Sequence, residues 1–224
     1  MKSEEYFVRQ IALWGEETQE ALASKKIAII GCGGLGSSLA LALGTSGIGT
    51  VHLVDFDTVS LHNIHRQIAF GLADEGHSKA SVVAKLLRAK NPFVTSLSFE
   101  MGFDDFAQLE GDYDLILDAT DNLPVRKKID HWAKAHATPW VYGSVEGFQG
   151  QVCFFDRATF GVFGGGEHTM EGIAAPMVMH VASLQANLAL RYLADLPVER
   201  DQLSYLYFDD AGALVTQKFG MPFE

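Results

Sequence analysis

The sequence feature that most constrains the fold is an apolar run that breaks into glycines and then resumes. Residues 26–30 have the composition of a buried β-strand, and Gly31, Gly33 and Gly36 follow with the spacing Gly-x-Gly-x-x-Gly. In such a loop the first glycine permits a tight turn, the second admits a ligand and the third lets helix and strand pack closely. A helix N-terminus also favours an anion such as a nucleotide phosphate. The spacing predicts a strand, a phosphate-binding loop and a helix.

A second predicted strand, residues 50–55, ends in an acid. Asp55 lies 19 residues beyond Gly36, near the offset at which a carboxylate accepts hydrogen bonds from ribose hydroxyls. Glycine-rich turns also occur where a helix only needs close packing, but the elements on both sides favour nucleotide binding. The fingerprint alone leaves open whether the nucleotide is NAD or ATP.

Composition restricts the partners and the compartment. The 224 residues, 48% of them hydrophobic, can form one α/β domain spanning residues 1–224. A net charge of −11 argues against nucleic acid or an anionic membrane as the main partner, because both need clustered cations. Cys32 and Cys153 give neither a disulfide framework nor a zinc-ribbon spacing. With no secretion signal and no transmembrane run in the sequence, we expect a soluble, cytoplasmic protein.

Helical and strand patterns alternate along the chain. A helical arm is predicted over residues 1–24, with a break at Gly15. After the opening unit, helices are expected over 78–90 and 123–136, and strands over 95–100, 113–118 and 140–143. This alternation predicts a doubly wound, mostly parallel, Rossmann-like sheet. The polar stretch 55–67 between the second strand and the next helix is expected to form a loop over the nucleotide.

The pattern changes after Val145. Residues 151–155 form a predicted strand, 157–172 a long glycine-rich loop, 174–194 an apolar helix, and 203–208 with 213–218 a hairpin. The sheet is therefore expected to end in antiparallel C-terminal strands. Met177, Met179 and His180 on the apolar helix are explained by packing or dimer contact rather than by a cofactor.

Polar residues stand just past predicted strands, where such a sheet binds its ligand. They are Asn63, Arg66, Lys79, and Asp118 with Asp121. Two cations near the loop favour a triphosphate, because a developing pyrophosphate needs charge compensation. An aspartate after the fourth strand suits Mg²⁺. Each residue also has a plain explanation: Arg66 and Lys79 as solvated charges, Asp121 and Asn122 as a helix cap. Their combination favours Mg-ATP.

In order and spacing, these motifs resemble the ThiF/MoeB/HesA family, bacterial relatives of ubiquitin-activating enzymes. The matching elements are Arg9-Gln10-Ile11, residues 31–36, Asp55-Phe56-Asp57, residues 63–67, Lys79, residues 118–122, Gly150-Gln151-Val152 and residues 183–186. The resemblance implies that the protein uses Mg-ATP to adenylate the C-terminal Gly-Gly carboxylate of a ubiquitin-like sulfur carrier such as ThiS or MoaD. It places that reaction, which releases pyrophosphate, in thiamine or molybdopterin synthesis.

The resemblance also implies roles for individual residues. Asp55 would hold the ribose, Arg66 and Lys79 the phosphates, and Asp121 the magnesium. Arg9 would reach the nucleotide of the neighbouring subunit, which implies a C2 homodimer. The rest of the implied nucleotide site consists of Gly31, Gly33, Gly34, Gly36, Asp57, Asn63 and Asn122. Because the attacking carboxylate is already ionised at pH 7, positioning and charge neutralisation should carry the rate.

The sequence departs from the family pattern in two ways. It lacks the pair of Cys-x-x-Cys motifs that holds zinc in many members, and residues 167–172 lack the cysteine of the loop before the last long helix. We therefore expect no zinc, and expect a separate sulfurtransferase to complete the reaction after the adenylate. His62 and His65 lack further metal ligands nearby and are interpreted as hydrogen-bonding loop histidines.

Other interpretations stay open. A Rossmann NAD-dependent oxidoreductase shares the glycine loop and Asp55, but leaves Arg66, Lys79 and residues 118–122 without a role. A degenerate protein that only binds is disfavoured because the nucleotide-facing pattern is intact. A peptide or tRNA could replace the carrier as substrate, as in the MccB and TcdA relatives.

Overall fold

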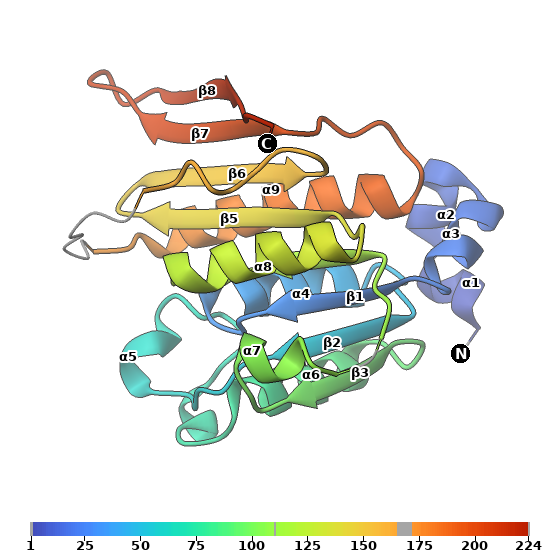
Figure 1. Cartoon of the computed structure of the whole chain (residues 1–224). Helices are drawn as coiled ribbons and strands as arrows, with labels where there is room; N and C mark the ends of the chain where they lie inside the picture. The colour runs from blue at the N-terminus through green and yellow to red at the C-terminus, as the bar shows by residue number, and fades with distance from the viewer. Residues whose placement is uncertain (1, 110, 165–171, 224) are drawn as a thin grey trace.

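An eight-stranded mixed sheet forms the centre of the protein (Figure 1). The computed structural model describes residues 2–109, 111–164 and 172–223. Within these residues the strand order is β3-β2-β1-β4-β5-β6-β7-β8. The strands are β1 Lys26–Ile30, β2 Thr50–Val54, β3 Thr95–Phe99, β4 Leu115–Asp118, β5 Trp140–Glu146, β6 Gln149–Phe155, β7 Gln202–Phe208 and β8 Leu214–Gly220.

The first five strands are parallel and the last three antiparallel, which confirms the predicted sheet. In register, Ile30 of β1 lies between Val54 of β2 and Asp118 of β4, so these strand ends meet at one edge. β5 and β6 form a hairpin that turns at Gly147, whose φ is +55°. The sequence patterns ended one strand at Gly143 and began the next at Gln151, so they missed the outer pairs of this hairpin.

Helices cover both faces of the sheet (Figure 1). Behind it lie α4 Gly34–Gly44, α6 Lys79–Lys90 and α9 Ala175–Leu193, and in front lie α7 Phe103–Phe106 and α8 Leu123–Ala135. The Ser78 hydroxyl caps α6, and Asn91 ends it in an extended conformation before Pro92, as predicted. The short elements α5 Leu61–Ile64, η1 Leu72–Asp74 and α7 were not predicted, because three or four residues carry no periodic signal.

Each face of the sheet has its own hydrophobic core. The rear core joins α4, α6 and α9 to the strands through side chains such as Leu39, Val83 and Val181. In the front core, Trp140 stacks on Phe155 with ring centroids 4.7 Å apart. Met177 is buried in the rear core, whereas Met179 is exposed. None of the helices among the described residues is both long and apolar enough to span a membrane.

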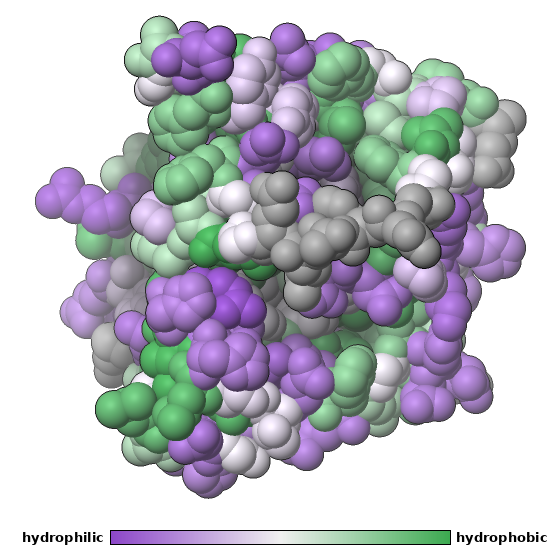
Figure 2. All heavy atoms as spheres, turned by 90° about the vertical axis from the view of Figure 1, so that its left-hand side faces the viewer, coloured by the Kyte–Doolittle hydropathy of each residue, from purple (hydrophilic) through white to green (hydrophobic). Residues whose placement is uncertain are grey.

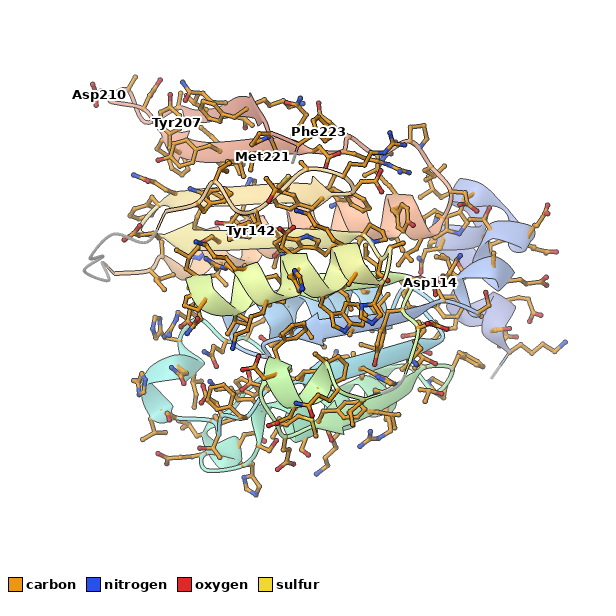
Figure 3. All side chains as sticks on the ribbon, in the orientation of Figure 1. Asp114, Tyr142, Tyr207, Asp210, Met221 and Phe223 are labelled. Atoms are coloured by element: carbon orange, nitrogen blue, oxygen red, sulfur yellow. The ribbon has the colours of Figure 1, made fainter. Side chains whose placement is uncertain are left out.

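The predicted N-terminal arm consists of α1 Ser3–Tyr6, α2 Val8–Trp14 and α3 Glu16–Leu22. Gly15, with φ +87°, separates α2 from α3. The arm lies beside the amino ends of the parallel strands, at the right of Figure 1. Asp114, on the same side of the molecule in Figure 3, accepts a hydrogen bond of 2.8 Å from the N–H of Lys26, at the start of β1. This end of the sheet is opposite the glycine loop.

The C-terminal residues pack against the front face of the antiparallel strands. Past β8, Met221 is buried and its N–H donates to the Asp201 carbonyl at 2.9 Å, whereas Phe223 is exposed (Figure 3). The loop expected over 157–172 is irregular in residues 157–164, and residues 165–171 lie outside the described residues. Of residues 167–172, which lack the cysteine of the family pattern, all but Gly172 therefore lie outside the described residues.

We expect Gly36→Ala to destabilise the fold severely. A Cβ at Gly36 would lie 1.8 Å from the carbonyl oxygen of Gly31, so α4 and the end of β1 would have to separate. The expected loss in the free energy of unfolding is at least about 3 kcal/mol, measured by urea denaturation. The control Gly164→Ala, in open space, should change it by less than about 0.5 kcal/mol. Equal stability of the two variants would refute the close-packing role of Gly36.

Candidate nucleotide site

A cavity of about 370 Å³ lies where the carboxyl ends of β1, β2, β4 and β5 meet. β1 and β4 are neighbours, and the chain crosses to opposite sides of the sheet from them, which is where doubly wound sheets bind ligands. Figure 2 faces this edge and shows many hydrophilic residues on it among smaller hydrophobic patches. The position of the cavity in the fold therefore matches the site expected from the sequence.

The β1–α4 loop forms one wall of the cavity. Gly31 has φ +93°, and a Cβ there would lie 2.7 Å from the Ala119 carbonyl oxygen. Gly33 caps α4 and Gly34 begins it, so the unpaired N–H groups of the first turn face this region. Gly31, Gly33 and Gly34 line the cavity, whereas Gly36 packs behind them. Of the four predicted glycines, three reach the cavity wall and one shapes the loop.

Two aspartates after β2 form a second wall. Asp55 accepts hydrogen bonds from the N–H of Cys32 at 2.6 Å and of Asp57 at 2.7 Å, which fix its orientation. Burial raises the pKa of Asp55, while the two N–H donors and Lys79 oppose that rise. Asp57 forms an ion pair with Lys79, whose Nζ lies 2.8 Å from the carboxylate. Lys79 is buried, so it is not the solvated surface charge of the plain alternative.

The segment around α5 adds a cation to the cavity. Arg66 lines it, donating at 3.1 Å to the His62 carbonyl and at 3.1 Å to Nε2 of His65. His65 thus makes a hydrogen bond of the kind expected for a loop histidine. Asn63 is buried beneath this segment, and its carbonyl accepts the N–H groups of Arg66 and Gln67. It lies outside the cavity wall that the sequence assigned to it.

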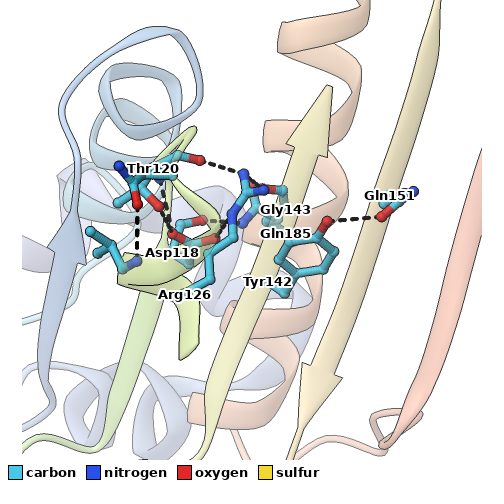
Figure 4. A network of polar contacts seen from close by, with 9 residues as sticks. Asp118, Thr120, Arg126, Tyr142, Gly143, Gln151 and Gln185 are labelled. Atoms are coloured by element: carbon cyan, nitrogen blue, oxygen red, sulfur yellow. Dashed lines mark hydrogen bonds and ion pairs between the residues drawn. The ribbon is translucent and has the colours of Figure 1, made fainter. Parts of the chain in front are cut away.

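Asp118 belongs to a buried network rather than to the ligand surface (Figure 4). Its Oδ2 lies 3.1 Å from Nε of Arg126, and its Oδ1 accepts from the N–H and hydroxyl of Thr120 at 3.0 and 2.7 Å. Burial raises the pKa of Asp118, and the Arg126 guanidinium opposes that rise. Because protein donors occupy both oxygens, the expectation that Asp118 faces the ligand together with Asp121 is wrong for Asp118.

Arg126 is a site residue that the sequence patterns missed. It projects from the first turn of α8 to the cavity, donates to the carbonyls of Thr120 and Gly143, and lies 5.1 Å from the Tyr142 ring centroid. An arginine near a helix start carries no sequence signal for burial. Gln67 also lines the cavity and is buried, although the sequence patterns indicated no role for it beyond its place in a motif.

The rim of the cavity carries Asp121 and Asn122. The Asn122 side chain accepts the N–H of Val125 at 3.1 Å, so it caps α8 as the plain alternative proposed. Asp121 is exposed and forms no ion pair with another described residue. Its oxygens suit a hard cation such as Mg²⁺. No cluster of three or more metal-ligating acids, histidines and cysteines occurs in the described ranges.

Arg9 is a predicted site residue that does not line this cavity. It is exposed on α2, at the amino ends of the parallel strands, whereas the cavity lies at their carboxyl ends (Figure 1). Arg9 is therefore separated by the length of the sheet from the cavity of its own chain.

The fold and the cavity define a doubly wound nucleotide-binding protein. A helix N-terminus for phosphates, an oriented carboxylate for a ribose and nearby cations are combined in one crevice. The chain belongs to the ThiF family, whose model matches residues 7–217.

Several proteins that the chain is similar to are named adenylyltransferases. The chain is 34% identical to the molybdopterin-synthase adenylyltransferase of Escherichia coli, over 83% of this chain and 80% of that protein. It is 36% identical to the sulfur carrier protein adenylyltransferase of Thermus thermophilus, over 65% of this chain and 54% of that protein. The probable adenylyltransferase/sulfurtransferase MoeZ of Mycobacterium tuberculosis is 37% identical, but this chain spans only 36% of it.

Solved structures share the whole architecture. The crystal structure of PaaA has a TM-score of 0.83 at 24% identity and covers all of this chain and 75% of its own. E. coli MccB with ATP has a TM-score of 0.83 at 18% identity, over 96% of this chain and 71% of its own. These likenesses establish the fold.

We expect Arg126→Met to cost about 3 to 5 kcal/mol of stability, because it leaves Asp118 buried and unpaired. The pKa of Asp118 is already raised, and loss of the guanidinium should raise it further. An acid with a raised pKa in the folded state stabilises less as pH rises, so from about pH 4 upward the variant should lose stability over a wider pH range than the wild type. Urea denaturation across pH checks this.

The double variant Asp118→Asn/Arg126→Met is the control. Since it has no buried carboxylate at this position, it should recover part of the stability and lose the pH dependence that Asp118 causes. A single variant whose stability falls over the same pH range as that of the wild type would contradict the assigned pair.

Proposed function

We propose that the protein is an ATP-dependent adenylyltransferase that activates the C-terminal Gly-Gly carboxylate of a small ubiquitin-like sulfur carrier. The observation that carries this proposal is the grouping of Lys79 and Arg66 with the N-terminus of α4 in one cavity. Two cations beside a helix N-terminus suit a triphosphate better than the internal diester of NAD. The names of the relatives support the same reaction class, with a carrier of the ThiS or MoaD type in thiamine or molybdopterin synthesis.

The cavity suggests an orientation for the nucleotide. The ribose would bind at Asp55, and the phosphates would extend from there toward α4, Lys79 and Arg66. The apolar side chains of Val54, Met101 and Phe103 line the cavity and suit the adenine ring. Mg²⁺ would be held by Asp121 and phosphate oxygens, where it would offset charge on the leaving pyrophosphate.

The chemistry needs little from the protein beyond position and charge. A carrier carboxylate oxygen would attack the α-phosphorus, and the bond from that phosphorus to the β-phosphate oxygen would break to release pyrophosphate. No proton has to be removed, because the carboxylate is ionised. Lys79 keeps its ammonium group oriented through Asp57 and can still donate to a phosphate, while Arg66 adds a second charge.

The environment of both cysteines favours a reaction that ends at the acyl-adenylate. Cys32 and Cys153, the two cysteines of the sequence, are buried. Burial raises the pKa of both thiols well above the ordinary value, which disfavours the nucleophilic thiolate. A separate sulfurtransferase would then supply the sulfur. The cytoplasmic location expected from the sequence would place this reaction in a reducing compartment.

We further propose a homodimer in which Arg9 of one chain completes the site of the other. Arg9 on α2 does not line the cavity of its own chain. If it contacts a nucleotide, that nucleotide must therefore be bound by another chain. The exposed apolar side chains of Val8 and Leu13 on the same helix suit a subunit contact.

The cysteine-free variant Cys32→Ala/Cys153→Ala tests both the activity and its end point. We expect carrier-dependent exchange of labelled pyrophosphate into ATP to persist, because adenylation requires no thiol. Thermal melting verifies that the variant is folded. Absence of exchange by the wild type with any ThiS- or MoaD-type carrier would overturn the proposed function, and exchange dependent on a peptide or tRNA would indicate the alternative substrates. A thioester trapped on Cys153 in the wild type would overturn the end point.

Subunit complementation tests the shared site. Arg9→Ala and Asp121→Ala subunits, each inactive alone, should recover about a quarter of the wild-type rate when mixed at random. Half of the dimers would be mixed, and one of the two sites in each would contain both residues. No recovery in mixed dimers that have been verified by mass would contradict a site built from two chains.

A further inference from the structure

Gln67 places a buried carboxamide in the cavity wall. The residue is 5% exposed, and its Oε1 contacts no donor among the described residues. Its backbone is fixed, because its N–H donates to the Asn63 carbonyl at 3.0 Å and its carbonyl accepts from Phe70 at 3.1 Å. The main chain of Gln67 is therefore held in place, whereas the oxygen of its carboxamide accepts no hydrogen bond from the described part of the chain.

A buried amide of this kind is unfavourable for the folded protein. Leaving a buried donor or acceptor unpaired destabilises the folded state, whereas an apolar side chain of the same shape avoids that cost. By contrast, Gln19, which is 6% exposed, donates to the Ser46 carbonyl and accepts from Trp14. Packing alone explains Gln19 but leaves the amide of Gln67 unexplained.

The position of Gln67 points to the phosphates. A Cβ at Gly33 would lie 3.3 Å from Nε2 of Gln67, so the carboxamide packs directly on the residue that caps α4. Arg66 is its chain neighbour, and all three residues line the cavity. The amide is thus placed beside unpaired N–H groups of the helix N-terminus and beside a cation, where an anion is favoured.

We infer that Gln67 is a nucleotide-positioning residue whose carboxamide N–H donates to a phosphate oxygen. No hydrogen bond to its Oε1 from the described residues restrains the side chain, so the amide can rotate to meet the ligand. A neutral donor here would orient the phosphate, while Arg66 and Lys79 would offset its charge. This inference rests on the proposed binding of ATP in the cavity.

The predicted signature is opposite effects on stability and on binding. Gln67→Met removes the amide and keeps the approximate shape, so the nucleotide-free variant should melt at a higher temperature than the wild type. Its ATP affinity, measured by calorimetric titration with Mg²⁺, should fall about tenfold or more, as expected for a lost hydrogen bond to a charged group. Gln67→Glu should weaken ATP further, because its carboxylate repels the phosphates.

The matched control is Gln19→Met at the other end of the sheet. It should melt at a lower temperature, because it loses two hydrogen bonds, and should bind ATP as the wild type does. If the wild type binds no ATP, the proposed function fails. If the wild type binds ATP and both Gln67 variants bind it equally well, or if Gln67→Met melts at a lower temperature, the inference about Gln67 is overturned.

Discussion

The end of β1, the start of α4 and the loop after β4 approach one another so closely that side chains are excluded between them. A Cβ at Gly36 would lie 1.8 Å from the Gly31 carbonyl, and one at Gly31 would lie 2.7 Å from the Ala119 carbonyl. This approach aims the N-terminus of α4 at the crevice between β1 and β4. It also determines where an anion can bind, because the free N–H groups of the helix then point into the cavity.

A buried ion pair connects the other elements of the crevice to the loop after β4. Asp118 at the end of β4 pairs with Arg126 of α8, and Arg126 in turn reaches the Gly143 carbonyl of β5. From the rear layer, Gln185 of α9 donates to the Asp118 carbonyl at 2.8 Å (Figure 4). The pair of Asp118 and Arg126 thus joins strands β4 and β5 to helix α8 in front of the sheet and helix α9 behind it. We interpret Asp118 as the residue that sets the position of the cavity wall, while Asp55 and Lys79 face its contents.

The sequence predicted the sheet and much of the cavity wall, because these depend on patterns with a physical period or on special backbone geometry. Glycine spacing located the loop around Gly31, and the alternation of apolar strands and helices indicated the order of the sheet. Side-chain direction just past a strand end has no such period. That is why Asp118 was expected at the ligand surface, and why the burial of Arg126 and Gln67 went unpredicted. The outer residues of the β5–β6 hairpin were missed because their mixed polar and glycine composition gives no strand signal.

Calorimetric titration of the wild-type protein with ATP and Mg²⁺, and separately with NAD, most directly tests the central claim that this crevice is a triphosphate site. We predict one ATP bound per chain, with binding that weakens when Lys79 or Arg66 is replaced by alanine, and no comparable binding of NAD. Tight binding of NAD together with no heat of ATP binding would contradict it.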